Sequence, residues 1–349
     1  MRKIQSLLFP FVLIILSLSA VSLQAASFKV VSHNVWSGFT SFYDLNVDEK
    51  PENPFKLSCA DDYYKYKGRF EAYLSYLSEE VVKSENFIIA FQEMDNKTKR
   101  ACGDKFSLTQ EVDEYFSPGV ENRFLGLVPM DGGEGFANSQ SHGAAAGVYN
   151  GNAIVTRPNI IETKYEKFRA IEGKSRRGYI ATLLEVEPGK QLWFVNIHAT
   201  HDKVARNLAV EDVEEMLVGM KDVYRETPRP IIFAGDFNIT FRTEYYDQLI
   251  DLFEKHFEGT IEATQPINKT YQNKIKDSVG GGNTLKDSHK IDYIFYYSPG
   301  GQIKQKVLPA GALNKHPIPV MSAGAKDALC IDGECFPDHK LIYAEFYWP

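Results

Sequence analysis

The hydrophobic positions of the chain follow two patterns, a helical period in some segments and short apolar runs in others. Three segments carry apolar residues at every third or fourth position, which predicts helices. The first spans residues 63 to 83, and the other two run from Val204 to Val223 and from Tyr246 to Phe257. Because the first two lie between predicted strands, we expect sheets covered by helices. The predicted strands are runs rich in β-branched and aromatic residues: FKVVSHNVW, FIIAFQEMD, GNAIVTR, YIATLLEVE, QLWFVNIHAT, PIIFAGDFN, KIDYIFYY and KLIYAEFYW.

Polar residues stand at the ends or the beginnings of these predicted strands. In RPIIFAGDFNIT, for example, Asp236 and Asn238 directly follow a buried apolar run. If neighbouring strands run antiparallel, the ends of some and the beginnings of others lie along one sheet edge. We therefore expect these side chains to meet in one cleft. The residues concerned are Asn34, Glu93, His198, Asp236, Asn238, Asp292, Asp338 and His339.

Each of these residues has a plainer explanation when it is taken alone. Asn34 or Asn238 could bond to its own backbone in a turn, and His198 could be a hydrogen-bonded core histidine. Glu93 is harder to explain in this way, because a carboxylate directly after a buried strand is costly unless it is paired or holds a cation. The joint occurrence of all of them in this order favours a functional site.

With their neighbours, these residues resemble a known family. The chain carries, in order, SHNVW, AFQEMD, GNAIVTRP, SRRG, NIHAT, GDFN, KIDYIF and PDHK. These motifs are similar to those of the endonuclease/exonuclease/phosphatase superfamily, which includes the DNase I-like nucleases and the bacterial neutral sphingomyelinases. The resemblance implies a secreted bacterial member of this superfamily. It also implies the DNase I-like fold, a four-layer α/β/β/α sandwich with two mixed, mostly antiparallel sheets.

The resemblance implies a cation site and a water-orienting pair. Asn34, Glu93 and Asp338 would hold a divalent cation. Oxygen ligands of this kind suit Mg²⁺, with Mn²⁺ or Ca²⁺ as alternatives, better than they suit zinc. Asp236 and Asn238 would orient the attacking water and hold the phosphoryl oxygens.

The remaining matching positions would act on the phosphate and on protons. His198 would donate to the phosphate or to the leaving oxygen, and His339, oriented by Asp292, would act as general base. Arg177 and Asn152 would contact the phosphate. One stretch departs from the DNase-type pattern, because VYNGNAIVT lacks the glutamate that supports the first catalytic histidine in that branch. This departure puts a strict DNase mechanism at His198 in doubt.

Phosphodiester hydrolysis explains why these residue types occur together. The reaction places negative charge on the phosphoryl oxygens and on the departing alkoxide while a water molecule loses a proton, so the site needs cationic clamps, an acid and a base. Carboxylates alone would repel the substrate. A bound cation inverts that local field.

The first residues of the chain have a composition of their own. They combine a basic start, an apolar stretch of about 15 residues and small residues before position 27, which is the layout of a secretory signal peptide. A retained N-terminal anchor is the alternative, although the run is short for a spanning helix and contains Pro10. We therefore expect a signal peptide at 1–26 and one catalytic domain at 27–349. The mature protein would be periplasmic or extracellular, without integral membrane association.

The charge of the chain limits its partners. The formal net charge of the 349 residues is −7, and loss of Arg2 and Lys3 with the leader would leave 37 basic residues against 46 acidic ones, or −9. An acidic protein has no global attraction for nucleic acid or anionic lipid. Any contact with a polyanion must therefore be local or mediated by a metal ion.

The four cysteines all lie beyond the predicted leader. An even number in an exported chain permits two disulfides. Cys330 and Cys335, in CIDGEC, are close enough to close a small loop, which would leave Cys59 to pair with Cys102. Metal-ligand cysteines are the alternative, but no CxxC spacing or paired histidine supports them.

We expect an exported Mg²⁺-dependent phosphodiester hydrolase that acts as a monomer. A DNase I-like nuclease is favoured over a sphingomyelinase-like phospholipase C, because the sequence shows no compact Trp/Phe hairpin suited to lipid insertion. A phosphomonoesterase ranks third. The alternative from a different class is a binding or toxin subunit that keeps the fold without turnover. The complete set of polar positions argues against it, since a binding scaffold needs no metal ligands beside a base.

Overall fold

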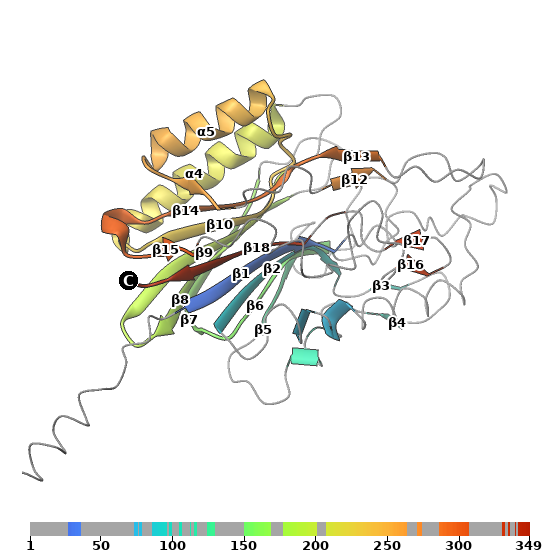
Figure 1. Cartoon of the computed structure of the whole chain (residues 1–349), viewed down its shortest axis with the longest axis horizontal. Coiled ribbons are helices and arrows are strands. Elements are labelled where there is room, and N and C mark those ends of the chain that lie inside the picture. The colour runs from blue at the N-terminus through green and yellow to red at the C-terminus, as the bar shows by residue number, and fades with distance from the viewer. Residues whose placement is uncertain are drawn as a thin grey trace, which may run out of the picture.

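A computed structural model shows two six-stranded sheets stacked face to face, with helices outside them (Figure 1). No helix among its described residues is long and apolar enough to cross a membrane. The structure describes residues 27–35, 73–75, 77–78, 86–95, 98–99, 105–106, 112, 115–116, 124–129, 150–168, 177–200, 207–263, 271–273, 286–306, 330–331, 334–335, 339 and 341–349. The predicted signal peptide lies outside these residues.

The first sheet has the strand order β15-β18-β1-β2-β6-β5. Its central strands β1 and β2 are parallel, and every other pair of neighbours is antiparallel. The bounds are Ser27–Asn34 for β1, Asn86–Asp95 for β2, Phe124–Pro129 for β5, Asn150–Thr156 for β6, Lys304–Gln305 for β15 and Ile342–Tyr347 for β18.

The second sheet has the order β11-β14-β10-β9-β8-β7. Here β9 and β10 are parallel and the remaining neighbours are antiparallel. The bounds are Asn159–Lys167 for β7, Gly178–Glu187 for β8, Lys190–His198 for β9, Ile231–Asp236 for β10, Ile261–Glu262 for β11 and Asp292–Tyr297 for β14.

Short elements complete the described fold. A 3-10 turn, η6, covers Pro299–Gly301. Three two-stranded ribbons pair β3 with β4, β12 with β13, and β16 with β17. Their bounds are Thr98–Lys99, Lys105–Phe106, Tyr271–Asn273, Lys286–His289, Cys330–Ile331 and Glu334–Cys335.

Two long helices cover the outer face of the second sheet (Figure 1). They are α4, Leu208–Glu226, and α5, Glu244–His256. Thr243 caps α5 by accepting a hydrogen bond from the Tyr246 backbone N–H, which satisfies one of the free donors of the first turn. Both helices follow the predicted apolar periods. Of the first predicted helix, residues 73–75 are helical in the described part.

The predicted fold class is confirmed. Each of the eight runs that predicted a strand forms one, and each sheet mixes one parallel pair with antiparallel ones. The prediction missed β7, which lies at the edge of the second sheet. Most of its residues are exposed, and Ile161 and Tyr165 are among the exposed ones. An edge strand of this kind lacks the alternation of apolar and polar residues by which strands are recognised.

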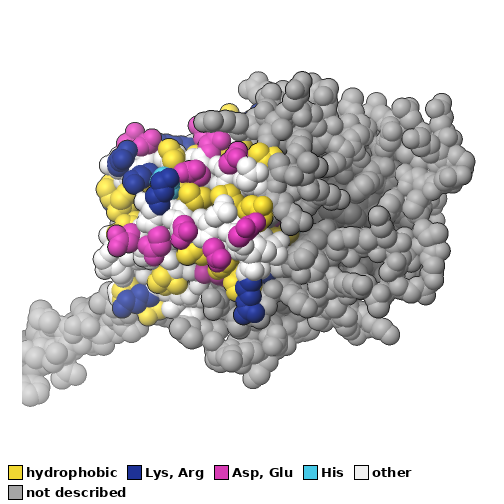
Figure 2. Space-filling model, turned by 90° about the horizontal axis from the view of Figure 1, so that it is seen from above, with side chains coloured by type: hydrophobic (Ala, Val, Ile, Leu, Met, Phe, Trp, Pro, Cys, Tyr) yellow, Lys and Arg dark blue, Asp and Glu magenta, His cyan; other side chains and the backbone are white. Residues whose placement is uncertain are grey.

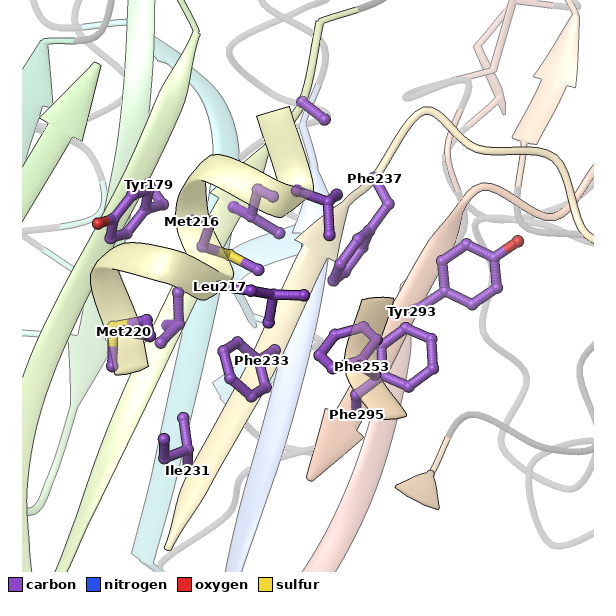
Figure 3. Close-up of a cluster of buried hydrophobic side chains, with 14 of the residues drawn as sticks. Tyr179, Met216, Leu217, Met220, Ile231, Phe233, Phe237, Phe253, Tyr293 and Phe295 are labelled. Atoms are coloured by element: carbon purple, nitrogen blue, oxygen red, sulfur yellow. The ribbon is translucent and has the colours of Figure 1, made fainter. Parts of the chain in front are cut away.

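Apolar side chains fill both interfaces of the second sheet. Between the sheet and its helices, Phe233 and Phe295 pack on Phe253 of α5, at ring centroid distances of 5.2 and 4.5 Å (Figure 3). Between the two sheets lies a second cluster, to which Val30 of β1 and Ile232 of β10 both belong. The strand ends therefore project from a close-packed core.

A polar network also connects the two sheets. Asn196 of β9 donates through Nδ2 to the backbone oxygens of Phe91 and Ala153 in the first sheet, at 2.9 Å each. Its Oδ1 accepts a hydrogen bond of 2.7 Å from Nε2 of Gln92 in β2. Both amides are fully buried. Because an unsatisfied buried polar group costs about 1 to 3 kcal/mol, these bonds favour one alignment of the sheets.

The predicted disulfides lie mostly outside the described atoms. The antiparallel pairing of β16 and β17 places Cys330 opposite Cys335, which brings the two backbones together as a disulfide would require. The side chains of these residues, and all of Cys59 and Cys102, are not described. Both pairings stay predictions.

Gly235 provides a test of the packing between β9 and β10. Its φ is +149°, and a Cβ at this position would lie 2.0 Å from the backbone oxygen of Ile197, its partner in the parallel ladder. We expect Gly235→Ala to lower the free energy of unfolding by more than about 3 kcal/mol, since β9 and β10 must move apart. Turnover per folded molecule should also fall, and denaturant titration checks the stability.

Gly189→Ala is the matched control for this prediction. Gly189 has a φ of +78° in the turn between β8 and β9, and no atom lies within 4 Å of a Cβ built there. The left-handed backbone alone should cost about 1 to 2 kcal/mol, with turnover unchanged. Equal losses of stability in the two variants would show that the contact with Ile197 is not the cause.

Candidate active site

The ends of β9 and β10 and the beginning of β14 bring three polar residues side by side. In the parallel ladder His198 is opposite Asp236, and in the antiparallel ladder Asp236 is opposite Asp292. Each of the three is at most 5% exposed. This register is the reason that residues far apart in the sequence share one site.

The first sheet contributes a second group of polar side chains to the same place. Nδ2 of Asn34, at the end of β1, donates to Oδ2 of Asp236 at 3.1 Å and to Oε1 of Glu93 at 3.3 Å. Asp236 belongs to the other sheet, so the contact crosses the sandwich. The site is thus built from both sheets.

Glu93 occupies an irregular position in β2. The pairing of β2 with β6 shifts in register between Phe91 and Met94, and Glu93 between them has a φ of +57°. A β-bulge of this kind re-aims a side chain. A left-handed glutamate is unfavourable, and such conformations are concentrated at functional sites. The strained backbone turns the Glu93 carboxylate toward Asn34.

His339 and Asp292 form a close pair. Nδ1 of His339 lies 3.1 and 3.0 Å from the two carboxylate oxygens of Asp292, and both residues are buried. An ionised carboxylate only accepts, so Nδ1 carries the hydrogen. In the neutral ring, Nε2 then offers a lone pair, and this atom lies 3.8 Å from Oδ2 of Asp236. The arrangement is that of a general base held by a carboxylate.

Two nitrogen-bearing side chains, an imidazole and a guanidinium, face the carboxylates. Nε2 of His198 lies 3.4 Å from Oδ2 of Asp236 and 3.8 Å from Oε1 of Glu93. Nη2 of Arg177 lies 3.8 Å from the same Glu93 oxygen. Within the described part of the chain, the buried Nη1 of Arg177 makes no hydrogen bond. This donor suits an anionic ligand such as a phosphate.

Asn238 lies at the same edge. Its backbone N–H donates to Oδ1 of Asp236 at 2.9 Å, its Nδ2 donates to the Ala199 backbone oxygen at 2.8 Å, and its φ is +51°. Among the described residues, Nδ2 makes this one hydrogen bond. Asn238 thus adjoins Asp236, and its predicted contact with the phosphate stays a prediction.

Asn152 is engaged differently. Its Nδ2 donates to the backbone oxygens of Gly178 and Asn196, at 3.1 and 3.2 Å, and it is fully buried. Both hydrogens of the amide are thus used, so a phosphate contact would require it to leave a carbonyl. Its predicted role stays a prediction. Asp338, the third predicted metal ligand, lies outside the described residues.

Asp212 is a buried acid that the sequence analysis missed. Its Oδ2 accepts a hydrogen bond of 2.7 Å from the Thr200 backbone N–H, which holds the segment that follows His198. Burial raises the pKa of Asp212 to about 6, and the bonds to Thr200 oppose the rise. A signal existed, because Asp212 lies midway between Leu208 and Met216 on the apolar stripe of α4.

The clustering of acids changes the protonation of Asp236. Its pKa is raised to about 7, mainly by burial and also by the nearby charge of Asp292, against the lowering effects of His339 and Arg177. A site that holds several carboxylates away from water favours a bound cation or a bound proton.

Comparison with known proteins agrees with this geometry. The profile of the Endonuclease/Exonuclease/phosphatase family matches residues 31–313. The chain belongs to this family. A search of curated protein sequences found no match.

Solved structures resemble this endonuclease/exonuclease/phosphatase family chain in fold. A family protein from Bacteroides thetaiotaomicron is 17% identical, with a TM-score of 0.56, over 93% of this chain and 99% of that one. TDP2 from D. rerio, complexed with a single-strand DNA product, is 15% identical, with a TM-score of 0.53, over 92% and 99%. The mannosyl-6-phosphatase Bt3783 from Bacteroides thetaiotaomicron is 16% identical, with a TM-score of 0.51, over 91% and 98%. At these identities the likeness is one of fold.

Family membership makes the chain a metal-dependent phosphoester hydrolase, the class of enzyme that the sequence predicted. The donor set fits a divalent cation, because the carboxylates of Glu93 and Asp236 converge on Asn34, whose amide would bind the ion through Oδ1 in place of the Nδ2 bonds. The described residues also contain a compact trio, Asp236, Asp292 and His339, whose ligand atoms lie within 4.8 Å of one another. This trio shares no member with the predicted ligands.

The raised pKa of Asp236 makes stability depend on pH in one direction. A carboxyl group with a higher pKa in the folded protein stabilises the fold fully below its unfolded pKa, and this contribution is lost as the pH rises through about 7. Asp236→Asn removes the titration. In the presence of a chelator, we expect the Tm of the variant minus that of the wild type to increase from about pH 4 to about pH 8. Thermal melts at both pH values check this, and a constant difference would show that the folded protein ionises Asp236 without penalty.

Proposed function

We propose that the protein is an exported Mg²⁺-dependent phosphodiesterase whose favoured substrate is nucleic acid. The observation that carries this proposal is the His339–Asp292 pair, in which the second ring nitrogen, Nε2 of His339, lies 3.8 Å from Oδ2 of Asp236, with Arg177 and His198 nearby. A base, an acid and phosphate-binding groups are the parts that diester hydrolysis needs in one place.

The residues divide the chemistry among themselves. Nε2 of His339 accepts a proton from the attacking water, and Asp292 holds the ring and stabilises the charge that forms on it. The 3.8 Å between Nε2 of His339 and Oδ2 of Asp236 is too long for a direct hydrogen bond, so a water molecule fits as the bridge. Asp236 thereby orients the water. On the other side of Asp236, His198 supplies a proton to the leaving oxygen.

Binding of the phosphate falls to groups around this pair. Arg177 and the second Nδ2 hydrogen of Asn238 donate to the phosphoryl oxygens. Asn34 and Glu93, together with Asp338 by resemblance, would hold Mg²⁺, and the ion supplies a Lewis acid that stabilises charge on those oxygens.

Nucleic acid is favoured over lipid as the substrate on two grounds. TDP2 of the same fold is complexed with a single-strand DNA product, and the sequence lacks a hairpin suited to lipid insertion. Figure 2 shows basic and acidic side chains interspersed on the described face that it presents, and the formal net charge is −7. Binding of a polyanion would therefore be a local event at the site rather than a long-range attraction.

A substrate panel tests the proposal. Purified mature protein is incubated with plasmid DNA, RNA, sphingomyelin, a sugar phosphomonoester and a soluble aryl phosphodiester, each with Mg²⁺ and with chelator. We expect cleavage of DNA or RNA and of the aryl diester, dependent on Mg²⁺, and none by a His339→Ala preparation. Preferential cleavage of sphingomyelin or of the monoester would replace nucleic acid as the substrate. If no substrate is cleaved, the proposal that this protein is a phosphodiesterase is refuted.

Glu93→Gln tests the cation site. The change keeps the shape of the side chain but removes the charge that would hold Mg²⁺, so we expect weaker Mg²⁺ binding by calorimetry and a fall in turnover by about 10- to 100-fold or more. Glu226→Gln is the control, because Glu226 is 73% exposed at the end of α4. Unchanged Mg²⁺ affinity in Glu93→Gln would show that Glu93 is no ligand.

His339→Ala tests the base. Loss of a general base typically costs about 10² to 10⁴ in rate, so kcat should fall at least that far while Mg²⁺ binding remains. Asp292→Asn should lower kcat less, since an amide oxygen can still accept from Nδ1. Measuring kcat and Tm on the same preparations separates catalysis from stability. A near-normal kcat with a lowered Tm would mean that His339 serves only a buried network.

A further inference from the structure

His33 lies next to Asn34 but on the opposite face of β1. Successive side chains of a strand point to opposite faces. Asn34 therefore reaches the site between the sheets, whereas Val31 and Val35 belong to the apolar cluster on the outer face. His33 points the same way as those valines, and its ring lies edge-on to that of Tyr73, with centroids 5.0 Å apart. It is 1% exposed.

Both ring nitrogens of His33 have defined partners. Nε2 lies 3.2 Å from the backbone oxygen of His339, and Nδ1 lies 2.8 Å from the hydroxyl of Tyr73. A carbonyl oxygen only accepts, so Nε2 must carry the hydrogen. Nδ1 then accepts from the Tyr73 hydroxyl. The contacts thus determine the tautomer of the ring.

Burial keeps this arrangement neutral. It lowers the pKa of His33 to about 3, although the bond to His339 opposes the shift. A neutral ring with one donor and one acceptor matches its two partners.

His339 is consequently held at two points by two sheets. Asp292 of the second sheet binds its ring at Nδ1, and His33 of the first sheet binds its main chain. The direction of Nε2 depends on both the ring torsions and the place of the backbone. The bond that Nδ1 donates to Asp292 fixes the ring torsions, and the bond that His33 donates fixes the backbone.

We propose that His33, supported by Tyr73, is a positioning residue for His339. The proposal rests on the function proposed above, in which Nε2 of His339 accepts the proton of the attacking water. One strand end thereby serves the site twice, through Asn34 on the inner face and through His33 on the outer face. A displacement of about 1 Å at a catalytic group can cost about 10²-fold in rate. Loss of the hydrogen bond that holds the His339 backbone should therefore lower the rate measurably.

Three variants test the proposal in the full chain. His33→Leu removes the donor to His339 and replaces the ring with an apolar side chain of similar size. His33→Gln places an amide N–H close to the position of Nε2 and so keeps the donor. Leu77→Ala, in the same buried cluster as Tyr73, is the control for lost stability without loss of the anchor.

Kinetics with the aryl phosphodiester give the first measurement. We expect His33→Leu to lower kcat by about 10- to 100-fold, the usual effect of losing a group that orients a functional residue, with KM and Mg²⁺ affinity unchanged. His33→Gln should recover most of the loss, and Leu77→Ala should lower Tm with kcat per folded molecule preserved. Wild-type kcat in His33→Leu would overturn the proposal, as would an equal loss of kcat in Leu77→Ala at a matched loss of Tm.

Ring NMR in the resting protein gives a measurement that needs no turnover. We expect the wild type and His33→Gln to show one Nδ1–H resonance for His339, and His33→Leu to show it broadened or split by several ring positions. An unchanged resonance in His33→Leu would overturn the positioning role. If the wild type cleaves no substrate, the proposed function fails, while this spectrum still decides whether His33 positions His339.

Discussion

The hydrogen bonds that Asn196 makes across the sandwich are the constraint on which the site depends. Each sheet carries only part of the polar cluster, and the apolar interface between the sheets is non-directional. Asn196 accepts from Gln92 and donates to two backbone oxygens of the first sheet. Sliding one sheet against the other would break these bonds in a fully buried region. The distance of 3.1 Å between Asn34 and Asp236 is preserved for this reason.

The site contains features of unfavourable free energy, and the stability of the surrounding structure must offset them. Glu93 adopts a left-handed backbone, and Asp236 is buried beside another acid, which raises its pKa. Such features are expected where catalysis requires charge and fixed geometry. The close aromatic packing of α5 on β10 and β14 (Figure 3) lies against the strands that carry these groups. The rigid core thus holds a strained site.

His33 and His339 show how the same type of side chain can have different roles. His33 is buried among apolar residues, and its nitrogens are matched to a carbonyl and a hydroxyl, so its ring stays neutral. His339 is matched to a carboxylate at one nitrogen, which favours the charged ring once a proton arrives. The surroundings of each histidine, rather than its residue type, make His33 a structural partner and His339 a base.

The sequence by itself determined the strands and the polar residues at their ends. A run of apolar, β-branched and aromatic residues and an apolar period of 3.6 are local properties, so β10 and α5 could be recognised without knowledge of their neighbours. The order of the motifs also predicted the family, which is confirmed, and predicted Asp236 and His339 as site residues. These inferences needed only the chain and its resemblance to known motifs.

Tertiary structure decided which groups touch. Three features depend on contacts between segments that are distant in the chain. They are the bulge that turns Glu93, the hydrogen bonds from Asn152 to two backbone oxygens, and the bond from His33 to His339. No local pattern reports such partners, because a polar side chain in a strand has the same propensity whether it meets a substrate or a backbone oxygen. β7 escaped recognition for a related reason, since its edge position leaves it no buried face to impose a pattern. Which residues pair across long stretches of the chain, and which of them become buried as a result, cannot be read from the sequence one residue at a time.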